Sequence, residues 1–149
     1  MNEFELTESV GRKKAKRLFN KYELVESDNI FSCWDFSGRT QSIADEAVNY
    51  FIEVKNRDLK STTYDTTFLE VEKLNALKAV ADANEKAAIF YLCFFNDDIA
   101  YMFNLRKIDI TNVSIFQMNL RHKTAIDVGI KQKLLIEIPL ELGKRYKVN

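Results

Sequence analysis

The stretch Asn49-Tyr50-Phe51-Ile52-Glu53-Val54-Lys55 decides the fold, because its pattern predicts a strand with apolar side chains on both faces. Successive side chains of a strand point to opposite faces, so Glu53 and Lys55 project side by side, next to Phe51. Burying a carboxylate and an ammonium without a partner for either charge costs on the order of several kcal/mol per ion. We therefore expect this pair at a cleft, bound to each other or to a metal ion. The opposite face carries Tyr50, Ile52 and Val54.

A second acidic residue, Asp35, lies between Trp34 and Phe36 on the preceding predicted strand, an unusual setting for a solvated charge. If the two strands pair antiparallel, Asp35 reaches the same face as Glu53, and two carboxylates converge with a lysine. Mg²⁺ prefers carboxylate and carbonyl oxygens, and a bound metal polarises a phosphodiester and lowers the pKa of its water. A neighbouring lysine can orient that water. The constellation suits metal-assisted phosphodiester hydrolysis and needs no histidine.

The position of the acid-x-Lys tripeptide within a predicted strand indicates a site more strongly than its residue types do. It occurs twice, as Glu53-Val54-Lys55 and as Asp58-Leu59-Lys60, which is about what chance predicts for this composition. The second copy follows the strand in a polar stretch and has no apolar context. Only the first copy is a candidate site.

The predicted elements alternate in a way that is typical of an α/β sandwich with a mixed central sheet. The first helix has one apolar stripe through Gly11, Ala15, Leu18, Phe19 and Tyr22. In the second helix, Leu74, Leu77 and Val80 or Ala81 should face inward. Asn96-Asp97-Asp98 predicts a hairpin turn. We expect helices over 4–22 and 72–83, and strands over 30–36, 47–55, 66–71, 88–95, 99–105, 113–120 and 133–140.

The order helix, strand with Asp, strand with Glu-x-Lys, helix, strand resembles the core of the PD-(D/E)XK nucleases, which include restriction endonucleases and Holliday-junction resolvases. The matching residues are Trp34-Asp35-Phe36 and Phe51-Ile52-Glu53-Val54-Lys55-Asn56-Arg57. Trp34 stands where the superfamily's name has proline. The resemblance implies a restriction endonuclease-like α-β-β-β-α-β core over about residues 4–105. Additional C-terminal strands would follow over 106–149.

The resemblance also implies roles for individual residues. Asp35 and Glu53 would be ligands of Mg²⁺ or Mn²⁺, with the Val54 carbonyl as a third ligand and Lys55 as the catalytic lysine. Many members add a glutamate on the first helix, for which Glu8 is the candidate and Glu5 the alternative. The alternative for both residues is an ordinary acidic side chain in the first helical turn, where it interacts favourably with the helix dipole.

Surface charge gives a second set of expectations, with DNA as the partner. The basic stretch of the first helix suits phosphate contacts, although a solvated helix flank explains it too. Lys73 corresponds to a polar position on the second helix of the family, and a solvated helix start is its alternative. The residues predicted to contact nucleic acid are Lys13, Lys14, Arg17, Arg57 and Lys73.

Bulk properties narrow the class of protein. A chain of 149 residues with zero net charge predicts one domain, 1–149, that is not a polycation overall. We expect no signal peptide and no membrane span. Cys33 and Cys93 suit reduced thiols of a cytoplasmic protein, and with the single His122 they lack the spacing of a zinc site.

Three hypotheses follow. The first is a metal-dependent DNA endonuclease, for which the family suggests a homodimer when both strands are cut. The second is an inactive nuclease-fold protein that binds DNA or a protein partner. The third is a structural module in which Glu53 and Lys55 form a buried ion pair and Asp35 faces away from them.

Overall fold

Strand β3 (Ala47–Asn56) lies at the centre of the computed structural model, which describes residues 3–20, 24–27, 33–41, 47–84, 87–109, 113–123 and 128–148. The alternation seen in the sequence is confirmed. Tyr50, Ile52 and Val54 belong to one buried cluster, whereas Phe51 belongs to another on the opposite face. Because both faces are covered, every charged side chain on this strand lies in or beside the protein interior.

The six-stranded sheet is mixed, in the order β1-β2-β3-β5-β6-β9. Strands β1, β2 and β3 form an antiparallel meander, and β5 then pairs parallel to β3. A parallel neighbour requires a crossover, which helix α2 supplies. The strands are β1 (Val25–Glu26), β2 (Phe36–Gln41), β5 (Ala88–Phe94), β6 (Ile99–Asn104) and β9 (Lys144–Lys147).

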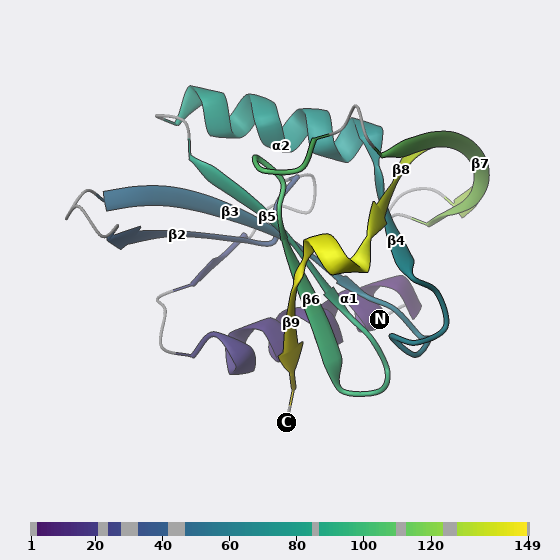
Figure 1. Ribbon diagram of the computed structural model, residues 1–149, viewed down its shortest axis with the longest axis horizontal. Helices are drawn as coiled ribbons and strands as arrows, with labels where there is room; N and C mark the ends of the chain where they lie inside the picture. Colours follow the sequence, from purple (N-terminus) through teal and green to yellow (C-terminus); the bar gives the residue numbers. More distant parts are fainter. Residues whose placement is uncertain are drawn as a thin grey trace.

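One helix covers each face of this sheet (Figure 1). Helix α1 (Glu3–Leu18) packs against β3 through its smallest residues, since Gly11 has Val54 and Asn56 as neighbours and Ala15 is fully buried. Helix α2 (Val71–Ala83) covers the other face with Leu74, Leu77 and Ala81. No helix in the described ranges is long and apolar enough to cross a bilayer.

A second, three-stranded antiparallel sheet lies beside the first, in the order β4-β8-β7 (Figure 1). Strand β4 (Thr66–Glu70) leads directly into α2, and it pairs with β8 (Val128–Pro139), which also pairs with β7 (Ser114–Lys123). A short 3-10 helix, η2 (Leu140–Leu142), then connects β8 to β9. The C-terminal strands therefore complete both sheets.

Most predicted elements are confirmed, and two expectations are corrected. Of the strand expected over 30–36, residues 30–32 lie outside the described residues, 33–35 are not part of a strand, and β2 runs over Phe36–Gln41, where the register against β3 begins. The strand at 66–70 forms as expected, but it pairs with β8 in the second sheet, not within the central one. Strands β1 and β9 were not predicted, since they have only two and four residues.

We expect Gly143→Ala to lower the free energy of unfolding by about 1–3 kcal/mol. A Cβ at Gly143 would lie 2.7 Å from Cε1 of Phe103, a buried ring that cannot move aside. Urea denaturation followed by circular dichroism measures the change. Leu142→Ala is the neighbouring control, because that side chain is 51% exposed and its loss should cost no more than about 0.5 kcal/mol. Equal effects of the two substitutions would contradict the packing of η2 and β9 described above.

Candidate functional site

Asp35 lies directly before the first residue of β2, where it is held against the neighbouring strand. The residue is only 4% exposed, and both carboxylate oxygens have partners. The Val54 amide donates to Oδ2 at 2.7 Å, and Arg12 Nε donates to Oδ1 at 2.9 Å. A charge-assisted bond from a backbone amide on β3 and an ion pair from α1 thus satisfy a carboxylate that water hardly reaches.

Arg12 connects three parts of the chain, a role that its position in the basic stretch of the first helix did not predict. Besides Asp35, its guanidinium donates to Oε1 of Glu26 at 3.2 Å and to the carbonyl of Ser27 at 3.0 Å. Burial acts to lower the pKa of Arg12, but the charge of Asp35, the hydrogen bonds to Asp35 and Glu26, and the charge of Glu8 together raise that pKa. The side chain therefore stays cationic and fixes Asp35 to α1 and β1.

Glu53 projects from the face of β3 that also carries Phe51 and that α2 covers. It is also 4% exposed, and its Oε1 lies 3.4 Å from Nζ of Lys73. Burial, followed by the negative charge of Asp35, raises the pKa of Glu53 to about 8, although Lys73 and Lys55 oppose the shift. Near neutral pH this carboxyl group titrates, so the attraction to Lys73 exists only in its ionised fraction. Asp35 and Glu53 are thus close enough for their charges to interact.

Lys55 is the next residue on the face that carries Glu53. Within the described ranges it has no ion pair of its own, but its charge lowers the pKa of both Glu53 and Glu70. Glu70, at the start of α2, instead pairs with Lys133 at 2.9 Å. The hypothesis of a Glu53–Lys55 ion pair is corrected here, because Lys73 is the residue that pairs with Glu53.

Arg57 was predicted to contact nucleic acid, but its side chain lies largely in the interior. Its guanidinium donates to the Phe68 carbonyl and to the Tyr91 hydroxyl, both at 3.1 Å, and stacks 4.3 Å from the centre of the Phe68 ring. Lys73 is likewise committed, to Glu53. Both residues serve contacts inside the protein, so neither presents a free cation for phosphate.

Of the residues predicted on α1, Lys13 and Arg17 are exposed. Lys14 is less free, since its ammonium donates to Oδ1 of Asn56 at 3.0 Å and lies 5.8 Å from the centre of the Phe94 ring. Glu8 is also exposed, and its charge acts on Arg12.

No group of three or more His, Cys, Asp or Glu side chains in the described part of the chain could hold a metal ion. Glu8 therefore does not complete a three-acid cluster with Asp35 and Glu53. The side chains of Glu5 and His122 lie outside the described residues. Cys33 and Cys93 are both free thiols, as expected. The structure thus brings together two carboxylates, the Val54 backbone and Lys55, which forms no ion pair with a described residue.

Comparison of the chain with protein-family models, with curated proteins and with solved structures finds no match.

We expect Glu53→Gln to change how stability depends on pH. The folded-state pKa of Glu53 is raised to about 8, so its ionisation destabilises the fold progressively between about pH 4.5 and 8. The stability of wild type relative to Glu53→Gln should therefore fall over this window, by an amount on the order of a few kcal/mol. Urea denaturation in chelator-treated buffer at a series of pH values measures the difference.

Glu70→Gln is the matched control with the opposite sign. The bond to Lys133 and its charge lower the pKa of Glu70 in spite of burial. The stability of wild type relative to Glu70→Gln should then be constant above about pH 5 and fall only at lower pH. Parallel curves for wild type and Glu53→Gln between pH 5 and 8 would contradict the raised pKa.

Proposed function

We propose that this protein is a metal-dependent nuclease that hydrolyses phosphodiester bonds of DNA. One observation carries the proposal: Asp35 and Glu53 are buried on neighbouring strands, and the charge of one raises the pKa of the other. Two carboxylates that repel each other in a dry environment are costly for stability alone. A divalent cation between them would relieve that repulsion.

The topology supports the choice of reaction class. Helix α1 and the antiparallel meander β1-β2-β3 are followed by a crossover through β4 and α2 to the parallel strand β5, an order that resembles the PD-(D/E)XK core except that β4 pairs in the second sheet. Asp35 stands at the start of the second strand, and Glu53 and Lys55 stand on the third. We therefore infer a restriction endonuclease-like core, supported by the agreement between element order and the positions of these three residues.

The donor atoms fit a hard divalent cation. Two carboxylates and the Val54 carbonyl offer oxygen ligands only, and Mg²⁺ is commonly held by one or two carboxylates while it keeps several waters. Arg12 and Lys73 now provide the positive charge that the carboxylates require. Bound there, Mg²⁺ or Mn²⁺ would polarise the scissile phosphate and lower the pKa of a ligated water.

The protein's own groups would divide the remaining tasks. Lys55 has no ion-pair partner among the described residues, so its ammonium is free to orient the attacking water and to stabilise charge developing on the phosphate. Arg12 and the Val54 amide would hold the Asp35 carboxylate in place. Lys73 would position Glu53 from α2.

We expect Mg²⁺ or Mn²⁺ binding in wild type that is lost in the double variant Asp35→Ala/Glu53→Ala. Titration calorimetry measures binding, and plasmid and branched-DNA cleavage are assayed on the same samples. Circular dichroism must show that the double variant remains folded, since removing buried charges leaves Arg12 and Lys73 unpaired. A folded wild type that binds neither cation would contradict the proposal.

Lys55→Gln should lower the cleavage rate by at least about 100-fold while metal affinity stays close to that of wild type. The reason is that Lys55 acts on the water and phosphate and is not a ligand. Lys60→Gln is the matched control, because Lys60 ends the other acid-x-Lys tripeptide and is exposed. Similar cleavage rates for Lys55→Gln and Lys60→Gln would remove Lys55 from the mechanism.

A second candidate is a nuclease-fold protein that binds DNA or a protein without cutting. The observation that favours it is that each buried carboxylate already has a cationic partner, Arg12 for Asp35 and Lys73 for Glu53. A site that is neutralised by its own side chains needs no metal. The calorimetric titration separates the two candidates, because only the nuclease requires a bound cation.

A further inference from the structure

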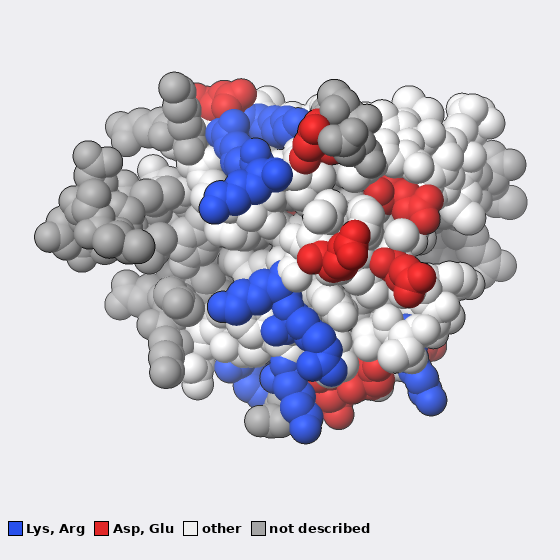
Figure 2. All heavy atoms as spheres, in the orientation of Figure 1, with Lys and Arg blue, Asp and Glu red and all other residues white. Residues whose placement is uncertain are grey.

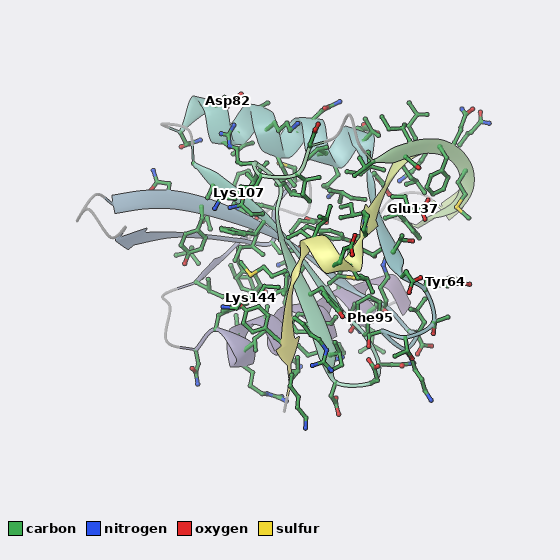
Figure 3. All side chains as sticks on the ribbon, in the orientation of Figure 1. Tyr64, Asp82, Phe95, Lys107, Glu137 and Lys144 are labelled. Carbon is green, nitrogen blue, oxygen red and sulfur yellow. The ribbon has the colours of Figure 1, made fainter. Side chains whose placement is uncertain are left out.

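Four cationic side chains lie on or next to the outer edge strand of the six-stranded sheet. Lys144, Arg145 and Lys147 belong to β9, the last strand of that sheet, and Lys107 comes from the segment after β6. We call these four residues the β9 strip. Figure 3 shows Lys107 and Lys144 on the left of the view, and Figure 2 shows basic side chains gathered on that side of the face.

The cations of the β9 strip have no acidic partner among the residues that the structure describes. In the ranges that the structure describes, none of the four forms an ion pair, and Lys144 lies only against the ring of its neighbour Tyr146, 5.2 Å from the centroid. The adjacent Arg106 differs, because it pairs with Asp82 at 2.9 Å. Lys107, Lys144, Arg145 and Lys147 are all exposed.

The strip is a local concentration of charge in a chain whose net charge is zero. On the same face, acidic side chains gather on the right of the view in Figure 2, and Glu137 is labelled there in Figure 3. Charge separation of this kind orients an approaching polyanion toward the basic side.

Protection of the sheet edge alone does not account for the strip. Charged residues on an edge strand prevent pairing with other chains, and the three on β9 would be enough for that. Lys107 is not on the edge strand, yet it extends the same basic side of the molecule (Figure 3). Arg145 and Lys147 lie two residues apart, about 7 Å along the strand, so they can reach successive anionic groups.

We propose that the β9 strip binds the sugar-phosphate backbone of DNA. The choice of DNA rests on the proposed function. Arg145 offers a planar fork for phosphate oxygens, and the lysines offer point charges. An anionic membrane fits less well, because membrane-binding surfaces combine cations with a continuous apolar face. Here Tyr146 packs inward against Phe19, and Leu142 is the exposed large apolar residue next to β9.

The strip contacts a part of the DNA away from the scissile bond. Strands β5 and β6 separate β9 from β3, which places these two strands about 14 Å apart across the sheet. Binding at the strip therefore needs neither Glu53 nor Lys55. It also differs from the basic surface expected on α1, where Lys14 bonds Asn56 and Lys16 pairs with Glu26.

The test measures binding of a fluorescently labelled duplex by anisotropy over a series of salt concentrations, with chelator present so that no cleavage occurs. Arg145→Gln/Lys147→Gln is compared with Lys13→Gln/Arg17→Gln, which removes the same two residue types from α1. We expect the strip variant alone to bind roughly tenfold more weakly, with a slope of log K against log salt that is shallower by about 2.

Four results of this binding experiment would overturn the proposal. No DNA binding by wild type, no loss in the strip variant, or an equal loss in the α1 variant overturns the proposal. Binding of wild type to phosphatidylserine vesicles but not to DNA also overturns it. The binding assay runs in chelator and substitutes no residue of the proposed metal site. Failure of the strip therefore leaves the metal site untouched, and loss of metal-dependent cleavage leaves the strip untouched.

Discussion

The burial of β3 on both faces is the constraint on which the rest of the structure depends. Neighbouring strands enclose it laterally, and α1 and α2 cover it from opposite sides. Charges on and beside this strand must therefore find partners inside the protein. Each helix supplies one: Arg12 of α1 reaches Asp35, and Lys73 of α2 reaches Glu53.

These two ion pairs differ in a way that matters for chemistry. Asp35 accepts a backbone amide as well as a guanidinium, so its ionised form is well supported. Glu53 has only a lysine at 3.4 Å and faces the charge of Asp35, so its ionised form is poorly supported. A carboxyl group in that condition gains more from an added cation than a satisfied one does. The asymmetry fits a site in which Asp35 is fixed and Glu53 responds to what binds.

Sequence periodicity predicted the parts of the fold that depend on local pattern. The two faces of β3, the small-residue stripe of α1 through Gly11 and Ala15, and the inward residues of α2 follow from spacing alone. The conspicuous position of Asp35 between two aromatic residues also identified it as unusual. Residue spacing does not predict how a helix packs against the sheet. It predicts a charged flank for α1, but not that Arg12 lies opposite Asp35.

The same limit explains the two corrected expectations. The strand expected over 30–36 rested on local composition, but pairing with β3 begins only at Phe36. Strand β4 follows β3 in sequence, but its partner β8 is far along the chain, so no local signal could assign it to a second sheet. Lys73 was singled out only for its place on the second helix, and its pairing with Glu53 required the packed structure.

The pairing of β4 with β8 has a consequence for how the chain folds. It joins residues as far apart as Thr66 and Pro139, 73 positions, and β9, which pairs with β6, comes still later in the chain. Contacts between residues so far apart in sequence slow folding, because the chain loses loop-closure entropy before the contacts contribute favourable free energy. The central meander and its helices can form early, whereas the second sheet and the β9 edge must wait for the end of the chain. Until then the free side of β6 is an exposed strand edge, and crowded refolding would favour aggregation through it.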